Sequence, residues 1–258
     1  MSNTLKRPVV VIGIGEIGSV LARGLLRCGH PVYPVTRDMD LQTASAEISE
    51  PEAVIVAVGE SELQAILSEM PVNWKDKLVL IQNELLPKDW QPHNIDPTVI
   101  SVWFEKKKGQ DVKVVVASPI HGKKSQLIAD ALSALDIPTV VINDVDEMTA
   151  ELVRKNYYIL LSNIAGLRVG GTVSELWANH QDFAKEVLLD IHALQQSMVG
   201  ESLDNQAVTE AMLVAFDGDP DHACMGRSAP ARLKRALDIA HEARIDVPML
   251  TQIAYEQE

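Results

Sequence analysis

The feature that most restricts the fold of this chain is a glycine-rich segment directly after an apolar run. Val9 to Ile12 are four consecutive apolar residues, which is typical of a strand buried on both faces of a parallel sheet. The next residues, Gly13-Ile14-Gly15-Glu16-Ile17-Gly18, match the pattern G-x-G-x-x-G, and apolar residues then recur at helical spacing as far as Arg27. The pattern therefore lies where a dinucleotide-binding turn requires it, after a buried strand and at the start of a helix.

Each glycine of this pattern has a physical task. Gly13 permits the tight turn, Gly15 lets the backbone approach a pyrophosphate, and Gly18 allows the helix to pack closely on the strand. The N–H groups at the start of the helix attract the anion. We therefore predict that residues 13–18 bind a dinucleotide, together with Val58 at the end of a later strand. The alternative is a structural glycine turn in a protein that binds no nucleotide.

Strand and helix patterns alternate through the first half of the chain, which predicts an α/β fold with a mostly parallel sheet. Two β-rich runs, 99–104 and 112–117, flank the polar residues 106–109 and are typical of an antiparallel hairpin. We expect an N-terminal Rossmann domain over residues 1–145. Its other strands are predicted at 31–36, 53–58, 78–82 and 139–142, and its other helices at 61–70 and 124–135.

Strand patterns essentially stop after Val145, and the apolar spacing becomes helical. We therefore predict a second, all-α domain over residues 146–258, for substrate binding or dimerisation. A helix beginning near Asp146 should lead from one domain into the other and leave a cleft, where ligands commonly bind. The long helical segments are expected around 147–167, 181–198, 205–214 and 229–243.

Composition narrows the range of partners. The 258 residues contain 36 acidic and 23 basic side chains, a formal net charge of −13, which makes nucleic acid and anionic membranes poor partners. The two cysteines belong to no metal-binding spacing, and an acidic run near Asp219 lacks the glycine and glutamate of a calcium loop. We expect no metal site. The first residues lack the layout of a signal peptide, so we expect a cytoplasmic protein.

The end of the second predicted strand indicates which dinucleotide binds. A protein that prefers NAD places an acidic residue there, on the ribose 2′-hydroxyl, whereas this chain has Thr36-Arg37. A guanidinium can pair with the 2′-phosphate of NADP through charge-assisted hydrogen bonds. The nearby Asp38 and Asp40 would repel that phosphate, so NAD stays as the alternative, but we predict NADP(H) as the cofactor.

Several segments together carry a family resemblance. A glycine-rich Rossmann half with Thr36-Arg37 is followed by Gln82-Asn83 after a later strand, by Arg154-Lys155 at the start of a helical half, and by Asn163. In this order the chain resembles the ketopantoate reductase family, within the superfamily of 6-phosphogluconate-dehydrogenase-like proteins. The resemblance covers most of the chain. It implies reduction of a 2-oxo acid or a similar small carbonyl by NADPH.

The same resemblance implies roles for three residues. Lys155 matches the general acid that protonates the developing alkoxide, and it precedes an apolar helical stretch that would lower its pKa by partial burial. Asn163 lies a little over two helical turns later, on roughly the same side, where it could orient the substrate or Lys155. Asn83 follows a strand, where Rossmann folds place the nicotinamide. The structural alternatives are a snorkelling lysine, a lysine that pairs with Glu151 one helical turn away, and capping asparagines.

The chain also departs from the family pattern. Ile159 stands where the family has Asn, Glu84 where it has Gly, and Pro230 where it has the Glu that binds the substrate hydroxyl. Ala223-Cys224 replaces a pair of serines. We therefore expect a small-molecule substrate other than ketopantoate, with His222 and Cys224 as the candidate substrate-binding residues of that region. The structural alternatives are a charged surface histidine and a cysteine that fills space.

Two other functions remain open at this stage. One is a non-catalytic NADP-binding sensor or interaction protein that kept the glycine loop and lost the substrate-side residues. The other is an enzyme of another branch of the superfamily, a β-hydroxyacid dehydrogenase or an imine reductase. The apolar second half could also supply the face of a homodimer.

Overall fold

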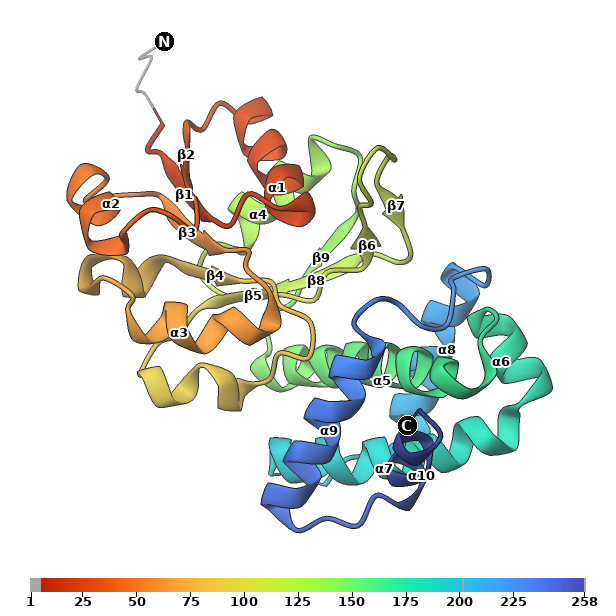
Figure 1. The fold of residues 1–258 in the computed structure, drawn as a ribbon. Helices are drawn as coiled ribbons and strands as arrows, with labels where there is room; N and C mark the ends of the chain where they lie inside the picture. Colours follow the sequence, from red (N-terminus) through yellow and green to blue (C-terminus); the bar gives the residue numbers. More distant parts are fainter. Residues whose placement is uncertain (1–5, 201, 258) are drawn as a thin grey trace. The chain divides into compact units, whose positions relative to one another are not determined.

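The structure is a computed structural model that describes residues 6–200 and 202–257. The chain divides into two compact units, residues 1–151 (unit 1) and 152–258 (unit 2). Unit 1 is an α/β structure and unit 2 is helical, as the sequence predicts (Figure 1). The division falls within one long helix, α5 (Val145–Val169).

Unit 1 is built on a seven-stranded sheet with the order β2-β1-β3-β4-β5-β8-β9. All neighbouring strands are parallel except β5 and β8, which confirms the predicted mostly parallel sheet. The strands are β1 (Val9–Ile12), β2 (Val32–Val35), β3 (Ala53–Val56), β4 (Leu78–Leu80), β5 (Thr98–Ile100), β8 (Ser118–His121) and β9 (Thr139–Val141).

Helices cover both faces of this sheet (Figure 1). On one face α1 packs against α4 so closely that a Cβ on Gly24 would lie 2.1 Å from the carbonyl oxygen of Ala131. Successive strand residues point to opposite faces, so these helices share one core with Val9, Val11 and their neighbours. The helices of unit 1 are α1 (Glu16–Arg27), α2 (Leu41–Glu47), α3 (Leu63–Ser68) and α4 (Ser125–Ser133), with short 3₁₀ turns at Glu60–Glu62, Val72–Lys77, Pro87–Asp89 and Gln91–His93.

The predicted hairpin is present but smaller than its β-rich runs suggest. Only β6 (Phe104–Glu105) and β7 (Lys113–Val114) pair antiparallel, in a separate two-stranded sheet. The run 99–104 is divided, because its first residues belong to β5 and pair inside the main sheet. The buried apolar residues at 99–104 thus serve two sheets, which local β propensity cannot distinguish.

Unit 2 consists of helices that bury their apolar faces against one another. A buried hydrogen bond of 2.9 Å from the amide of Asn156 on α5 to that of Gln195 on α7 joins two of them. The Asp190 carboxylate accepts the backbone N–H groups of Met249 and Leu250 at 2.8 and 2.9 Å, and so caps the start of α10. The helices after α5 are α6 (Val173–Asn179), α7 (Gln181–Val199), α8 (Asn205–Gly218), α9 (Ala229–Ala243) and α10 (Pro248–Tyr255).

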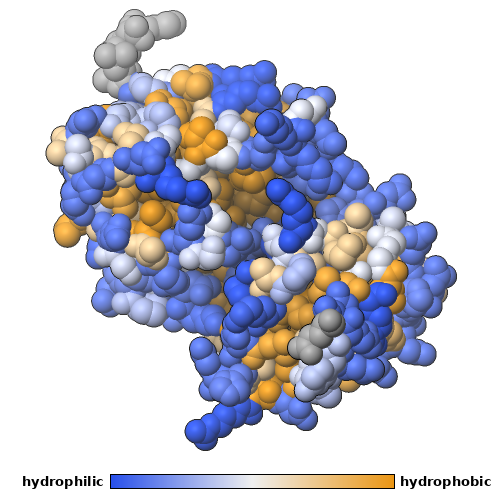
Figure 2. Space-filling model, viewed as in Figure 1, coloured by the Kyte–Doolittle hydropathy of each residue, from blue (hydrophilic) through white to orange (hydrophobic). Residues whose placement is uncertain are grey.

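Hydrophilic side chains cover most of the visible surface of each unit, with hydrophobic side chains in patches among them (Figure 2). Among the described residues, no helix combines the length and the apolar character that crossing a lipid bilayer would need.

Candidate functional site

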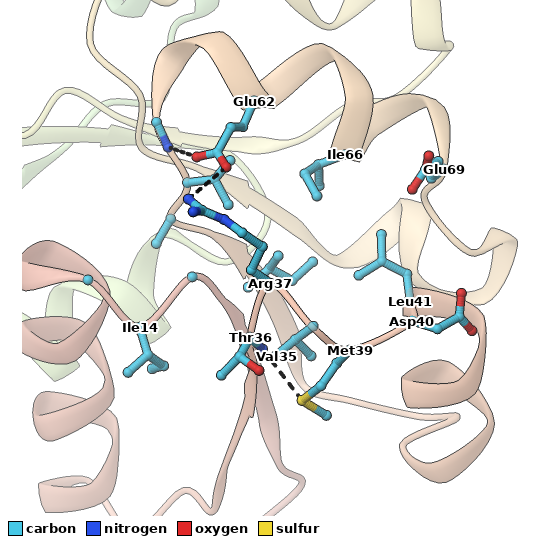
Figure 3. Close-up of a pocket in the computed structure, with 16 residues that line it drawn as sticks. Ile14, Val35, Thr36, Arg37, Met39, Asp40, Leu41, Glu62, Ile66 and Glu69 are labelled. Carbon is cyan, nitrogen blue, oxygen red and sulfur yellow. Dashed lines mark hydrogen bonds and ion pairs between the residues drawn. The ribbon is translucent and has the colours of Figure 1, made fainter.

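The glycine-rich turn opens onto a cavity of about 550 Å³ in unit 1. The cavity lies at the carboxyl ends of β1, β2 and β3, where the strand order changes direction because β2 lies on one side of β1 and β3 on the other. Open α/β sheets bind their ligands at such a switch point. Its lining combines the strand ends, the glycine turn and the segments that follow β2 and β3 (Figure 3): Ile12, Gly13, Ile14, Gly15, Val35, Thr36, Arg37, Met39, Asp40, Leu41, Ala57, Val58, Gly59, Glu62, Ile66 and Glu69.

The three glycines of the pattern have different surroundings. Gly13 has a φ of +90°, and a Cβ there would lie 2.7 Å from the carbonyl oxygen of Ala57; a Cβ on Gly18 would lie 2.1 Å from that of Gly13. Both positions therefore require glycine for the fold itself. Gly15 differs, because a Cβ there would meet no heavy atom within 4 Å and would project into open space. This bare backbone beside the start of α1 fits a pyrophosphate.

The predicted cofactor residues are brought together only in part. The cavity lining includes Gly13, Ile14, Gly15, Val58 and the pair Thr36-Arg37, whereas Glu16, Ile17 and Gly18 form the first turn of α1 beside it. The lining does not include Asn83.

One wall of the cavity is apolar and was not predicted from the sequence. Met39, Leu41 and Ile66 lie along it, between α2 and α3 (Figure 3). Such a wall suits the flat, weakly polar face of an adenine ring. The sequence signal for it was weak, because Met39 lies in the bend after β2, Leu41 begins a helix of seven residues, and Ile66 comes from a helix of only six.

The charges in the cavity are mostly negative. Arg37 extends from the segment after β2, and its Nη2 lies 3.1 Å from Oε1 of Glu62, at the end of the 3₁₀ turn after β3 (Figure 3). Asp40 also lines the cavity; the Thr43 backbone and hydroxyl donate to its carboxylate as the cap of α2, and these bonds lower its pKa. Glu69 is a third carboxylate in the lining.

A lysine from the small hairpin neutralises the acidic residue of the glycine-rich pattern. Lys106 Nζ lies 3.6 Å from Oε2 of Glu16, which stands in the first turn of α1. Without this partner, the Glu16 carboxylate would oppose an anion at the start of the helix. The hairpin thus places a positive charge beside the start of α1.

The Gln82-Asn83 pair lies at the end of β4. The Gln82 side chain is buried and donates to the carbonyl oxygens of Val56 and Val58 at 2.7 and 3.2 Å, which fixes the loop after β3 that lines the cavity. Asn83 is half-buried in the turn that follows. Gln82 therefore acts on the site through the backbone of its neighbour strand.

Glu84, one of the departures from the family pattern, has an unusual backbone conformation. Its φ is +59°, in the left-handed region that glycine adopts with little strain. A glycine, which the resemblance to the ketopantoate reductases implies here, would adopt this conformation with less strain than the glutamate of this chain. We expect Glu84→Gly to stabilise unit 1 by about 0.5–1 kcal/mol, seen as a rise of roughly 1–3 °C in thermal unfolding.

The control for this prediction is Glu84→Ala, which removes the same side chain but keeps a Cβ in the left-handed conformation. Alanine should give no gain in unfolding temperature. An equal gain from both variants would assign the effect to the side chain and contradict the backbone explanation.

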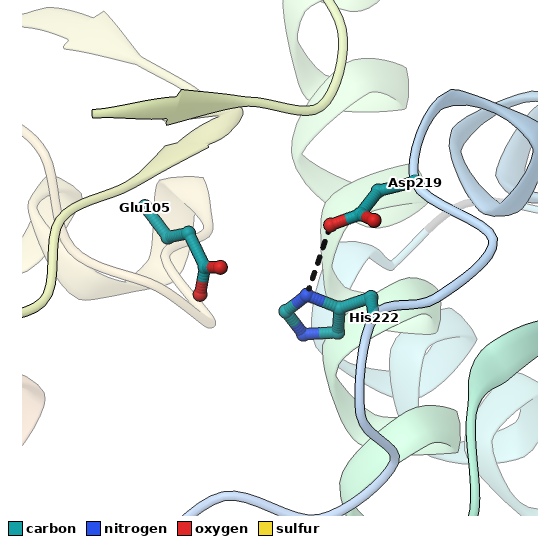
Figure 4. A group of neighbouring side chains, drawn as sticks. All are labelled: Glu105, Asp219 and His222. Atoms are coloured by element: carbon teal, nitrogen blue, oxygen red, sulfur yellow. Dashed lines mark ion pairs between the residues drawn. The ribbon is translucent and has the colours of Figure 1, made fainter. Parts of the chain in front are cut away.

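In unit 2, two of the predicted site residues contact the same aromatic ring. Lys155 Nζ lies 5.5 Å from the ring centroid of Tyr158, and the His222 ring lies 5.7 Å from the same centroid. Tyr158 is buried and packs edge-on against Phe216. Nδ1 of His222 lies 3.5 Å from the buried carboxylate of Asp219 (Figure 4). The sequence did not single out Tyr158 as the common neighbour of Lys155 and His222.

Asn163 is held by other parts of unit 2. Its Nδ2 donates to the Ile159 carbonyl oxygen at 2.9 Å, and its Oδ1 accepts the Gly226 N–H at 3.2 Å and a bond from Arg232 at 3.4 Å. Arg232 itself is buried. Asn163 therefore fixes the segment between α8 and α9, which carries His222, to helix α5.

Cys224 lies in this same segment and is buried. Burial, with a smaller contribution from the charge of Glu175, raises the pKa of its thiol to about 11. A Cβ on Gly166 would lie 2.8 Å from the Cys224 carbonyl carbon, so the segment packs tightly on α5. Cys224 therefore stays a neutral thiol near neutral pH and suits a packing role.

No family model matches the chain, and no curated protein matches it. Solved structures do match it along almost its whole length. The 2-dehydropantoate 2-reductase from Methylococcus capsulatus has 15% identity and a TM-score of 0.63, covering 97% of this chain and 95% of its own. A dimeric ketopantoate reductase from Staphylococcus aureus has 19% identity and a TM-score of 0.62, with 96% of each chain covered.

A ternary structure of D-mandelate dehydrogenase with NADH and anilino(oxo)acetate also matches, with 12% identity, a TM-score of 0.64 and 96% of each chain covered. These matches define a class of proteins in which a Rossmann-type unit is followed by a helical unit. Within that class, the chain has the fold of the ketopantoate reductases, which confirms the resemblance predicted from the sequence.

Proposed function

We propose that the chain is an NADPH-dependent oxidoreductase that reduces a small carbonyl compound of the 2-oxo acid type. The observation that carries the proposal is the cavity in unit 1, with its bare glycine backbone at one end and the guanidinium of Arg37 at another. The fold supports it, because the structures named above are of reductases and a dehydrogenase.

The cofactor site would use distinct parts of the cavity. Gly13 to Gly15 and the start of α1 would hold the pyrophosphate, the apolar wall would contact the adenine, and Arg37 would pair with the 2′-phosphate. A bound nicotinamide cofactor supplies the hydride, and the protein supplies orientation and a proton.

In this proposal, unit 2 supplies the proton. Lys155 would donate it to the developing alkoxide from Nζ, which the Tyr158 ring holds in place. Asn163 would act as a positioning residue through its bonds to Gly226 and Arg232, and Asn83 would position the nicotinamide.

The proposed substrate is not ketopantoate, because the substrate side of unit 2 differs from the family pattern. Ile159 is buried, and Pro230 is in the first turn of α9. Neither side chain can donate or accept a hydrogen bond with a substrate hydroxyl.

The test is binding followed by turnover. Calorimetric titration of the full chain should show micromolar binding of NADPH, and NADPH should be oxidised with at least one member of a panel of 2-oxo acids. Reduction of NADP⁺ by β-hydroxy acids, or oxidation of NADPH only with imines, would move the enzyme to another branch of the superfamily. NADPH binding with no turnover on any member would contradict the proposal and favour a non-catalytic sensor.

A further inference from the structure

The ion pair between Arg37 and Glu62 has no role in the proposed function. Arg37 is the cation that the cofactor proposal assigns to a 2′-phosphate, yet its Nη2 already lies 3.1 Å from Oε1 of Glu62. The other oxygen, Oε2, accepts the backbone N–H of Gly59 at 3.3 Å. The Glu62 carboxylate thus joins Arg37 to the loop after β3 (Figure 3).

Glu62 is held at this position by its surroundings. The next residue, Leu63, is buried and begins α3, and Leu67 one turn later is also buried. The backbone of Glu62 is therefore anchored to the core of unit 1, and the Gly59 N–H restricts the carboxylate. A phosphate that approached Arg37 would meet this carboxylate at close range.

The pair is nevertheless easy to exchange for a ligand. The Arg37 side chain is 86% exposed and that of Glu62 is 44% exposed. An exposed ion pair favours the paired over the unpaired state by about fivefold or less. A 2′-phosphate with roughly two negative charges can therefore compete for the guanidinium. Binding of the phosphate is then opposed by its repulsion from the Glu62 carboxylate, which cannot move far.

We propose that Glu62 is a specificity-determining residue that lowers the preference of this site for NADPH over NADH by pairing with Arg37. The inference rests on the proposed function, since it concerns the same cofactor site. An unphosphorylated ribose leaves the Arg37–Glu62 pair intact, whereas a 2′-phosphate has to break it. The chain should therefore accept both nucleotides with a modest preference, set by the balance between Arg37 and Glu62.

The experiment compares the dissociation constants of NADPH and NADH by calorimetry on the full chain and on Glu62→Gln. Glutamine keeps the size of the side chain and an acceptor for the Gly59 N–H, but it removes the charge. We expect NADPH to bind about 3- to 30-fold more tightly to the variant, because a repelling charge is removed and Arg37 is released. NADH affinity should change less than about threefold.

Two further variants identify the cause. Glu69→Gln removes another carboxylate of the same cavity, one that Figure 3 places away from Arg37, and it should leave the ratio of the two dissociation constants near that of the parent. In the Arg37→Ala background, Glu62→Gln should lose the part of its effect that comes from the release of Arg37 and keep only the part that comes from repulsion between the carboxylate and the phosphate.

The outcomes separate the two proposals. An unchanged ratio in Glu62→Gln, or an equal shift in Glu69→Gln, would overturn the role of Glu62 while leaving the dinucleotide site in place. Failure of the parent chain to bind either nucleotide would overturn the proposed function itself, and the role of Glu62 with it.

Discussion

Replacement of Gly15 by valine is expected to lower the affinity for both NADPH and NADH by at least about 100-fold, while the chain stays folded. The backbone at Gly15 has φ −74° and ψ −165°, which any residue adopts. No heavy atom lies within 4 Å of the Cβ position. The added side chain therefore meets no protein atom there and occupies the space that a pyrophosphate would need.

The measurement is calorimetric titration with both nucleotides, beside thermal unfolding of the same samples. Gly18→Val serves as the contrast, because its Cβ would lie 2.1 Å from the Gly13 carbonyl oxygen and should lower the unfolding temperature as well as the affinity. If Gly15→Val bound either nucleotide as tightly as the parent chain, the pyrophosphate would lie elsewhere and the cofactor site would have to be reassigned.

The contrast between these glycines shows what the sequence could predict. The pattern from Gly13 to Gly18 was sufficient to place the turn, because its spacing reflects steric requirements within a few residues. The pattern also assigned Gly15 to the close approach of a pyrophosphate, but the sequence could not show that a Cβ there would meet no heavy atom within 4 Å. Likewise, the Arg37–Glu62 pair joins residues from two different strand ends, and no local pattern links them.

Some missed elements did carry a local signal. Thr172 and Glu175 form a capping box at the start of α6, and Asp40 caps α2 by accepting the Thr43 N–H. Both are recognisable in a sequence as a capping residue three positions before its partner. These helices have only seven residues each, which is too short for apolar periodicity to stand out.

Other features of unit 2 depend on contacts between distant residues. Asp190 on α7 caps α10 through the N–H groups of Met249 and Leu250, and Asn163 binds Gly226 across the unit. Periodicity predicts that such helices exist, but it does not predict which polar side chain satisfies which helix end. The sequence therefore placed the helices better than it assigned the roles of their polar residues.

Lys155→Ala is expected to lower turnover at least about 100-fold, with little change in NADPH affinity. A loss of about 100-fold is the low end of the range expected when an enzyme loses its general acid. Lys155 is half-buried on α5, with its Nζ 5.5 Å from the centroid of the Tyr158 ring. The ring holds the ammonium group by a cation–π contact, so its position is defined before a substrate binds. The adenine and pyrophosphate contacts proposed above come from unit 1, so cofactor binding should survive.

The readout that separates a proton donor from a structural lysine is the pH dependence of turnover. A general acid must be protonated, so the activity of the parent chain should fall on the alkaline side as Lys155 loses its proton, and the residual activity of the variant should lack that limb. Lys234→Ala is the control, because Lys234 is exposed and pairs with Asp238 on α9. Full turnover in Lys155→Ala, or an unchanged alkaline limb, would remove Lys155 as the acid and leave His222, beside the same ring and paired with Asp219, as the group to test next.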